Sequence, residues 1–259
     1  TCLIQDQVTV VVHALPVVDA GDAIAICLDD GVQVLTAAPP GGTWSGNGVD
    51  AVGNFDPLLA QPGGNPVTYS YTDAATGCSN TDATTVTVHA LPVPGMNHAP
   101  VACANVPFLF TNTTSGASTY EWDFGDGTSS YSSDPTHIYT ATGTYDVRLI
   151  AISGAGCRDT TFSVVDVWDV PAVSVVLSTD TGCGPLEVEF TNGSSGDGLS
   201  FAWEFGGFGG SSDADPVPFI FPTDPNDAIT YTVSLTASNT CGQALATAPV
   251  TVLPPPTAL

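Results

Sequence analysis

The order cysteine, tryptophan, cysteine occurs three times along this chain, and it constrains the fold more than any other feature of the sequence. The tryptophan follows the first cysteine by 17 to 20 residues, and the second cysteine follows the tryptophan by 34 to 38. The three sets are Cys27, Trp44 and Cys78; Cys103, Trp122 and Cys157; and Cys183, Trp203 and Cys241. Recurrence at a nearly fixed period indicates a tandem array of small structural units. We therefore expect each tryptophan to lie in the core of its own repeat.

A second regularity marks where each repeat ends. Each of four cysteines precedes, by 11 residues, a short segment that runs into a proline; they are Cys2, Cys78, Cys157 and Cys241. The interval alternates apolar and polar residues, as a half-buried strand does, and proline then stops strand pairing. We expect a last strand of a preceding repeat, or a donor strand for another chain, at residues 1–16. The organisation predicted after it is three repeats at 17–92, 93–171 and 172–255, with a linker starting at 256–259.

Strand patterns dominate the rest of the sequence. Short runs rich in Val, Thr, Tyr and Phe are separated by turn residues, drawn from 27 Gly and 21 Pro in 259 residues, which is typical of all-β folds. No window keeps a helical period, and no apolar run approaches the roughly 18 residues that a membrane span needs. We expect almost no helix, and no membrane insertion in this segment.

The middle repeat carries motifs that resemble the polycystic-kidney-disease (PKD) domain, a β-sandwich of the immunoglobulin kind. The motifs are Trp122–Gly127 (WDFGDG), Asp134–Tyr139 (DPTHIY) and Gly143–Val147 (GTYDV). Alternation of Trp122 and Phe124 suits one buried strand face, and residues 125–127 are turn formers. The third repeat matches more loosely, through Trp203–Gly207, Phe219–Phe221 and Tyr231–Leu235.

The first repeat departs furthest from this pattern. Its segments Gly42–Gly48, Phe55–Pro57 and Tyr69–Tyr71 resemble immunoglobulin-like repeats of very long Bacteroidetes surface proteins. Mixed arrays of the two repeat types are similar to the giant adhesins and gliding-motility adhesins of that phylum. The resemblance implies three immunoglobulin-like or PKD-like β-sandwiches in tandem, on a secreted protein at the bacterial cell surface.

The charge balance excludes nucleic acid as a partner. Two arginines and no lysine stand against 26 acidic residues, for a net charge of −24, so no basic face is available to meet phosphates. Most acidic residues are scattered singly through turns, which indicates a soluble, self-repelling surface and no cofactor. Calcium bound by loop carboxylates is the alternative. Its weak candidates are Asp29 with Asp30, Asp123 with Asp126, and Asp213 with Asp215.

Seven cysteines in a turn-rich chain favour an oxidising, extracellular compartment. In a sandwich of alternating strands, the first cysteine of a repeat should lie at the end where the chain leaves, and the second at the end where it enters. A strand of about 20–27 Å would separate them, whereas a disulfide needs Cα atoms within roughly 7 Å.

We therefore favour disulfides between neighbouring repeats, Cys27–Cys157 and Cys103–Cys241, with Cys78 and Cys183 reaching repeats outside this chain. Two alternatives stay open. One is pairing inside each repeat, as Cys27–Cys78, Cys103–Cys157 and Cys183–Cys241, and the other is free or intermolecular thiols.

No catalytic constellation can be assembled from the sequence, which lacks a nucleophile elbow, an HExxH motif and a phosphate-binding glycine loop. His137 is interpreted as a structural hydrogen-bonding residue. We expect a non-catalytic spacer of an adhesin, filament or stalk, with neighbouring repeats and surface glycans or proteins as partners. Hydrophobic linker residues would pack between its repeats: Leu15, Leu91, Trp168 and Leu253.

Two alternative functions remain. One is an accessory spacer or substrate-binding region of a secreted enzyme that degrades polysaccharide or protein. The other is a self-assembling filament subunit that uses a donor strand.

Overall fold

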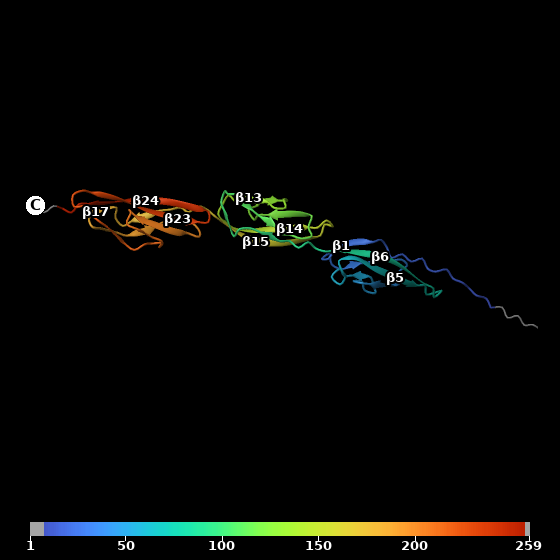
Figure 1. Cartoon of the computed structure of the whole chain (residues 1–259). Helices are drawn as coiled ribbons and strands as arrows, with labels where there is room; N and C mark the ends of the chain where they lie inside the picture. Colours follow the sequence, from blue (N-terminus) through green and yellow to red (C-terminus); the bar gives the residue numbers. More distant parts are fainter. Residues whose placement is uncertain (1–7, 257–259) are drawn as a thin grey trace, which may run out of the picture. The chain divides into compact units, whose positions relative to one another are not determined.

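The computed structural model describes residues 8–256, and every helix or strand assigned in that range is a β-strand. The strands form three sandwiches in tandem, so the predicted all-β class is confirmed (Figure 1). Among the described residues, no helix is long and apolar enough to cross a membrane.

Contacts between residues divide the chain into two compact units. One holds the chain up to Gly95 together with Thr113–Tyr120 and Ile150–Thr161. The other holds Met96–Asn112, Glu121–Leu149 and the chain from Phe162 onward. Segments of the middle repeat therefore belong to both units.

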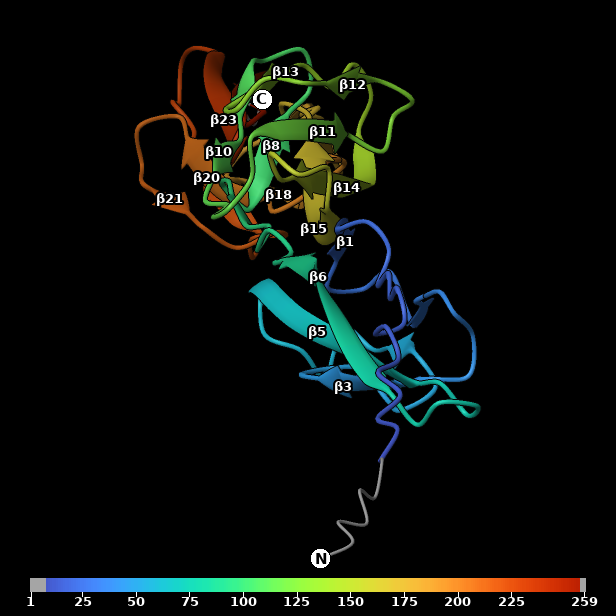
Figure 2. The ribbon, with the colours of Figure 1, turned by 90° about the vertical axis from the view of Figure 1, so that its right-hand side faces the viewer.

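The first repeat has a four-stranded sheet, in the order β1-β6-β5-β3, and a two-stranded sheet of β2 and β4 (Figure 2). The strands are β1 (Ile24–Cys27), β2 (Gln33–Val34), β3 (Thr43–Gly46), β4 (Asn54–Phe55), β5 (Gly63–Thr72) and β6 (Ser79–His89). Trp44 from β3, Phe55 from β4, and Val67 and Tyr69 from β5 form the core. Side chains on alternate positions of each strand thus fill the space between the two sheets.

The middle repeat has a five-stranded sheet, in the order β12-β11-β14-β15-β8, and two-stranded pairs β10-β7 and β13-β9. The strands are β7 (Met96–Asn97), β8 (Val101–Cys103), β9 (Phe108–Leu109), β10 (Thr111–Asn112), β11 (Thr119–Asp123), β12 (Ser129–Ser130), β13 (Thr136–His137), β14 (Gly143–Ile152) and β15 (Arg158–Trp168). Side chains alternate along β14, so that Val147, Leu149 and Ala151 are buried.

The third repeat repeats this plan, with a five-stranded sheet β17-β24-β23-β20-β21 and the pairs β18-β22 and β16-β19. The strands are β16 (Val175–Leu177), β17 (Thr181–Cys183), β18 (Leu186–Val188), β19 (Phe190–Asn192), β20 (Ser200–Phe205), β21 (Gly210–Ser211), β22 (Phe219–Phe221), β23 (Ile229–Asn239) and β24 (Gly242–Leu253). Its core contains Trp203, Phe190, Phe221 and Leu235. Together with Trp44 and Trp122, Trp203 is buried as expected, at 6%, 1% and 3% exposure in chain order.

The expected strand at residues 1–16 is not seen. Residues 1–7 lie outside the described part of the chain, and residues 8–16 form no strand. Val8, Val10 and Val12 are all more than three-quarters exposed. Pairing of this segment with another repeat therefore stays a prediction.

Candidate functional sites: disulfide joints and a turn network

The first cysteine of each repeat ends a short edge strand. This strand runs parallel to the last strand of the same repeat, so the cysteine lies beside that strand's final residue. The register pairs Cys27 with His89, Cys103 with Trp168, and Cys183 with Leu253. The cysteine thus lies where the chain leaves the repeat. Sequence reasoning placed it at this end but in a turn, because three- and four-residue edge strands give little periodic signal.

The second cysteine of each repeat lies at the opposite end. Cys78, Cys157 and Cys241 come directly before β6, β15 and β24, which are 11, 11 and 12 residues long. At about 3.3 Å per residue, such a strand separates the two cysteines of a repeat by roughly 35 Å, five times the reach of a disulfide. Pairing inside a repeat is therefore geometrically impossible in this fold.

Disulfides instead connect each repeat to the next. Cys27 bonds to Cys157 with the Cα atoms 5.6 Å apart, across 130 residues of sequence. Cys103 bonds to Cys241 with the Cα atoms 5.4 Å apart, across 138 residues. These are the pairs that strand direction favours, and the three pairs inside repeats do not form. Each bond lies within one of the two compact units.

The side chain of Asn239 makes hydrogen bonds around Cys241, where the disulfide connects the middle and third repeats. The sequence did not suggest these bonds. The Asn239 Nδ2 donates hydrogen bonds to the carbonyl oxygens of Asp169 and Asp197, at 2.8 and 3.0 Å. Its Oδ1 accepts the backbone N–H of Cys241 at 2.9 Å. One amide thus connects the linker, a loop of the third repeat and the disulfide.

Trp168 packs closely at the same joint. Gly198, with φ of +61°, leaves room for the indole, because a β-carbon at that position would collide with the ring. The linker residue Pro171 is buried, and Ala172 exchanges backbone hydrogen bonds with Ser195 at 3.0 and 2.8 Å. The chain is therefore held at several points as it passes between repeats.

Where the disulfide of Cys157 connects the first and middle repeats, the linker again has a buried proline and a pair of backbone hydrogen bonds. Pro92 is buried, and Val93 exchanges backbone hydrogen bonds with Ser115 at 2.9 and 3.0 Å. Cys157 is 2% exposed. Its hairpin closes through the Ser153 N–H, which donates to the Cys157 carbonyl oxygen at 2.8 Å.

The four hydrophobic linker residues differ in exposure. Leu91 and Trp168 are half-buried. Leu15 is 63% exposed and Leu253 is 37% exposed. Within the described chain, no repeat precedes Leu15 and none follows Leu253, so neither residue lies between two repeats there, and for these two the expected packing stays a prediction.

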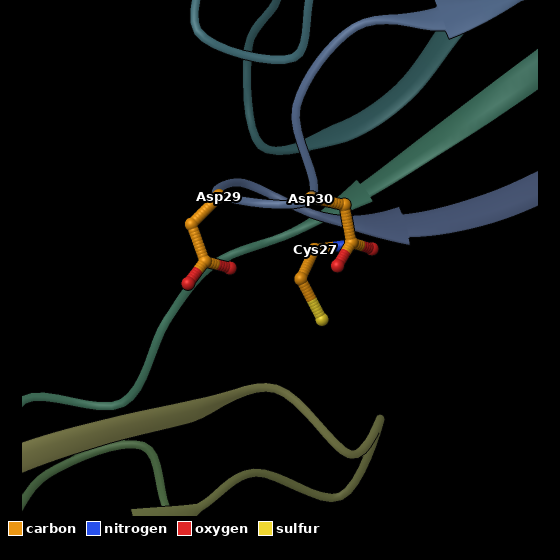
Figure 3. A group of neighbouring side chains, drawn as sticks. All are labelled: Cys27, Asp29 and Asp30. Atoms are coloured by element: carbon orange, nitrogen blue, oxygen red, sulfur yellow. The ribbon is translucent and has the colours of Figure 1, made fainter.

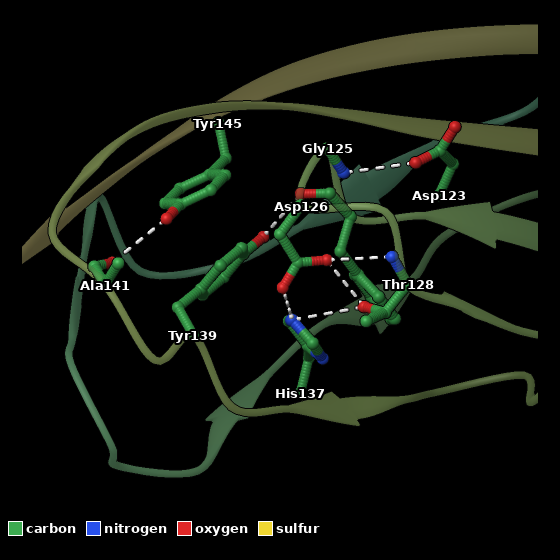
Figure 4. Close-up of polar contacts among 9 residues, drawn as sticks. Asp123, Gly125, Asp126, Thr128, His137, Tyr139, Ala141 and Tyr145 are labelled. Atoms are coloured by element: carbon green, nitrogen blue, oxygen red, sulfur yellow. Dashed lines mark hydrogen bonds and ion pairs between the residues drawn. The ribbon is translucent and has the colours of Figure 1, made fainter.

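A network of polar and aromatic contacts surrounds the turn after β11 (Figure 4). The Asp126 carboxylate accepts hydrogen bonds from the N–H and hydroxyl of Thr128, at 3.0 and 2.6 Å, and lies 2.8 Å from His137 Nε2. The His137 ring stacks on Phe124 with the centroids 4.2 Å apart. His137 therefore has the structural role that the sequence suggested, joining the turn to β13.

The surroundings in this network shift the pKa of Asp126 and of Tyr139 in opposite directions. Partial burial acts to raise the pKa of Asp126, but the hydrogen bonds from Thr128 and His137 outweigh it and hold that pKa below its usual value. Burial, with the nearby Asp126 charge and Tyr145, raises the pKa of the Tyr139 phenol, whose hydroxyl donates to the carbonyl oxygen of Phe124 at 3.2 Å. The folded domain therefore favours the ionised form of Asp126 and the neutral form of Tyr139.

Comparison with known families now identifies these repeats. Residues 90–167 match one profile described as PKD domain, and residues 174–252 match a second profile with the same description. The chain carries two PKD domains in tandem. The two matches together span more than half of the chain, and they coincide with the middle and third sandwiches.

Solved structures similar to the chain include single PKD domains and immunoglobulin arrays. The PKD1 domain of the Vibrio cholerae metalloprotease PrtV is 30% identical, covering 30% of this chain and 96% of that one, with a TM-score of 0.27. The PKD1 domain of Vibrio anguillarum Epp is 26% identical, covering 30% and 93%, with a TM-score of 0.27. The I-band fragment I67–I69 of titin is 11% identical, covering 92% and 96%, with a TM-score of 0.41.

The second PKD domain replaces the polar turn with an aromatic one. Phe219 takes the place of His137 and stacks on Phe205 at 5.2 Å between ring centroids. Phe208, in a glycine-rich loop, contacts the rings of Phe219 and Tyr231 and is 51% exposed. This domain thus presents an aromatic surface where the first PKD domain presents the contact between Asp126 and His137.

In the first PKD domain, the carboxylates suggested for calcium have other contacts. Asp123 accepts hydrogen bonds from Gly125 N–H and from Arg148 Nη2, both at 3.1 Å. Asp126 faces Thr128 and His137 instead, as Figure 4 shows. The two aspartates therefore stabilise the turn from separate sides.

Among the other candidates, Asp30 and Asp215 also accept hydrogen bonds. Asp29 and Asp30 lie beside Cys27 (Figure 3), but the Cys27 sulfur is bonded to Cys157, and the Asp30 carboxylate accepts the Cys27 N–H at 2.6 Å. Asp215 accepts the Asn192 N–H at 2.8 Å. Two carboxylates fall well short of the six to eight oxygen ligands that calcium takes, so these residues do not make up a calcium site by themselves.

Proposed function

We propose that this chain is a non-catalytic, disulfide-braced spacer within a long extracellular adhesin, filament or stalk protein of the bacterial cell surface. The observation that carries the proposal is the pair of disulfides between neighbouring repeats. Each joint is crossed by the backbone linker and by a second covalent connection. Two connections at separate points limit bending and twisting far more than one does.

Several features support a mechanical role. The buried linker prolines Pro92 and Pro171 limit rotation about the backbone. The turn histidine and carboxylates are occupied by contacts that stabilise loops, which favours a non-catalytic chain. Further repeats of the same or a similar chain are the proposed partners, with surface glycans or proteins contacted elsewhere on the parent protein. The resemblance of the first repeat to repeats of Bacteroidetes surface proteins supports the adhesin assignment.

Nuclear magnetic resonance relaxation tests the proposal on the intact, oxidised chain. Backbone ¹⁵N relaxation should give all three repeats the slow tumbling of one body. In the Cys103→Ser/Cys241→Ser variant, the third repeat should tumble faster than the first two. The matched Cys27→Ser/Cys157→Ser variant should free the first repeat instead. Independent tumbling of the three repeats in the oxidised wild-type chain would contradict the proposal.

One observation favours a second function, as a carbohydrate-binding accessory module of a secreted degrading enzyme. Phe208 is half exposed above Phe219 and Tyr231, and aromatic faces stack well on sugar rings. Retardation of the chain in gels that contain a polysaccharide, lost in Phe208→Ala and kept in Phe162→Ala, would support this function, because Phe162 is even more exposed, at 69%. Equal migration with and without the tested polysaccharides would count against it.

A further inference from the structure

The two disulfides create three covalent routes between the same two points of the chain. Cys27 is bonded to Cys157, and Cys103 is bonded to Cys241. Each bond joins two distant positions into one point, and the polypeptide connects the two points three times. The first route runs through the first repeat, the second through the middle repeat, and the third through β15 and the third repeat. In sequence order, the routes are the segments 27–103, 103–157 and 157–241.

The shortest route limits how far the two bonds can separate when the chain is stretched. The three routes contain 76, 54 and 84 residues in sequence order. An extended chain spans at most about 3.6 Å per residue, so the route through the middle repeat is taut at about 190 Å. Without either bond, the 214 residues from Cys27 to Cys241 would reach about 770 Å.

While it is folded, the first repeat shortens its own route much further. Cys27 lies beside His89, its partner in the parallel pairing of β1 with β6. The folded repeat therefore holds the start of the route next to the end of its last strand. Only the 14 residues from His89 to Cys103 remain to be stretched, and they reach about 50 Å.

The folded third repeat shortens the third route in the same way. Asn239 Nδ2 donates to the Asp169 carbonyl oxygen at 2.8 Å, and its Oδ1 accepts the Cys241 N–H at 2.9 Å. Cys241 is therefore held near Asp169, so the 12 residues from Cys157 to Asp169 are left to stretch, to about 43 Å. The 11 residues of β15 already span about 35 Å in the folded state.

We propose, resting on the spacer function above, that the two disulfides prevent tension from opening the middle repeat while either neighbouring repeat stays folded. Unfolding of the middle repeat alone releases its route, but the other two routes become taut after the bonds have moved apart by roughly 15 Å. Unfolding of one neighbour alone gains no more, because the remaining two routes still hold. Lengthening of the chain between the bonds therefore requires all three repeats to unfold together.

Removing one bond changes which repeat lies in the path of the tension. Without the bond from Cys27 to Cys157, the other disulfide carries tension past most of the middle repeat and past the third, and the path runs through the first repeat. Without the bond from Cys103 to Cys241, the path bypasses the first repeat and runs through β15 and the third repeat. The fully stretched paths are then 76 and 84 residues, about 270 and 300 Å.

Stretching single molecules in optical tweezers tests the proposal on the whole oxidised chain. Handles are attached through peptide tags at the two ends, so that no cysteine is used for attachment. Cys2, Cys78 and Cys183 are replaced by serine in every sample, which leaves the two disulfides as the variable. Residues outside the segment 27–241 then contribute equally to the length of every sample.

We expect one unfolding event between the bonds in the oxidised chain, ending at a stretched distance of about 190 Å from Cys27 to Cys241. Cys27→Ser/Cys157→Ser should end at about 270 Å and Cys103→Ser/Cys241→Ser at about 300 Å, each after unfolding of a single repeat. With all four cysteines replaced, three separate events should lead to about 770 Å. A variant that folds poorly still reports its stretched length, because that length depends only on covalent connectivity.

Separate unfolding events in the oxidised chain, each lengthening it between the bonds by well over 15 Å, would overturn the proposal. If the same molecules still end at about 190 Å, the bonds are present, and the stiff spacer measured by relaxation is left standing. A stretched length of about 770 Å for the oxidised chain would contradict both proposals, because neither bond would then exist.

Discussion

The indole nitrogen of Trp122 donates a hydrogen bond to the carbonyl oxygen of Ser132, ten residues further along the chain, at 3.0 Å. Trp203 makes the corresponding bond to Asp213, again ten residues on, at 3.1 Å. The bond satisfies the only polar atom of a buried ring and ties the segment after the hairpin to the core. The two PKD domains therefore share a polar anchor as well as a hydrophobic one.

Replacing Trp122 by alanine should lower the free energy of unfolding of its domain by about 3–5 kcal/mol, because it removes a large buried side chain and leaves a cavity. Hydrogen exchange of the β14 amides measures the loss inside that domain. A matched alanine variant of Tyr131, which is 76% exposed, should change the same quantity by less than about 0.5 kcal/mol. Equal effects of the two variants would contradict the assigned core.

The disulfide pairing predicts the outcome of peptide mapping without reduction. Digestion of the oxidised chain should yield cross-linked peptides containing Cys27 with Cys157 and Cys103 with Cys241. Recovery of a Cys27–Cys78 peptide would refute the arrangement, because the last strand of the first repeat holds those residues far apart.

Replacing Gly198 should destabilise the third repeat beside the linker that precedes it. Alanine there should destabilise the domain for two reasons, since φ is +61° and the β-carbon would strike the Trp168 ring. Gly207→Ala is the matched control, because φ is +90° but nothing lies within 4 Å of its β-carbon. Thermal unfolding should show a larger loss for Gly198→Ala, and the excess should disappear when Trp168 is also alanine. An excess that persists would exclude the steric explanation.

The lowered pKa of Asp126 should make the stability of the first PKD domain depend on pH under acidic conditions. Its pKa is lowered in the folded domain from the usual value of 3.8, so the folded state favours the ionised form. The resulting stabilisation is complete well above pH 4 and is lost as the pH falls through the lowered pKa. In Asp126→Asn, this part of the acid dependence should be absent from unfolding measured between pH 2 and pH 6. Asp146→Asn, at an exposed carboxylate of the same domain, should retain it; the same acid slope in both variants would contradict the assignment.

Strand direction was enough to favour the observed disulfides over pairing inside each repeat, because it depends only on the number of strands between two cysteines, but it left both alternatives open. The core tryptophans were predictable for a similar reason, since apolar alternation and turn residues recur in every repeat. Periodicity cannot reveal the parallel pairing of edge strands such as β1 and β8, which are three or four residues long. Their hydrogen-bond partners lie more than sixty residues away.

The contacts of Asn239 and the fit of Trp168 against Gly198 were also beyond reach from the sequence. They depend on how a loop, a linker and a hairpin tip meet in space. The carboxylates proposed for calcium illustrate the converse problem. Asp123 and Asp126 are neighbours in sequence, yet they face different partners across a tight turn.

The two disulfide-closed loops overlap, because each runs past the start or end of the other and both contain residues 103–157. Cleavage of any single peptide bond between Cys27 and Cys241 therefore falls inside at least one loop closed by a disulfide. Both fragments stay attached through sulfur, so a protein exposed to foreign proteases would not be shed by one cleavage.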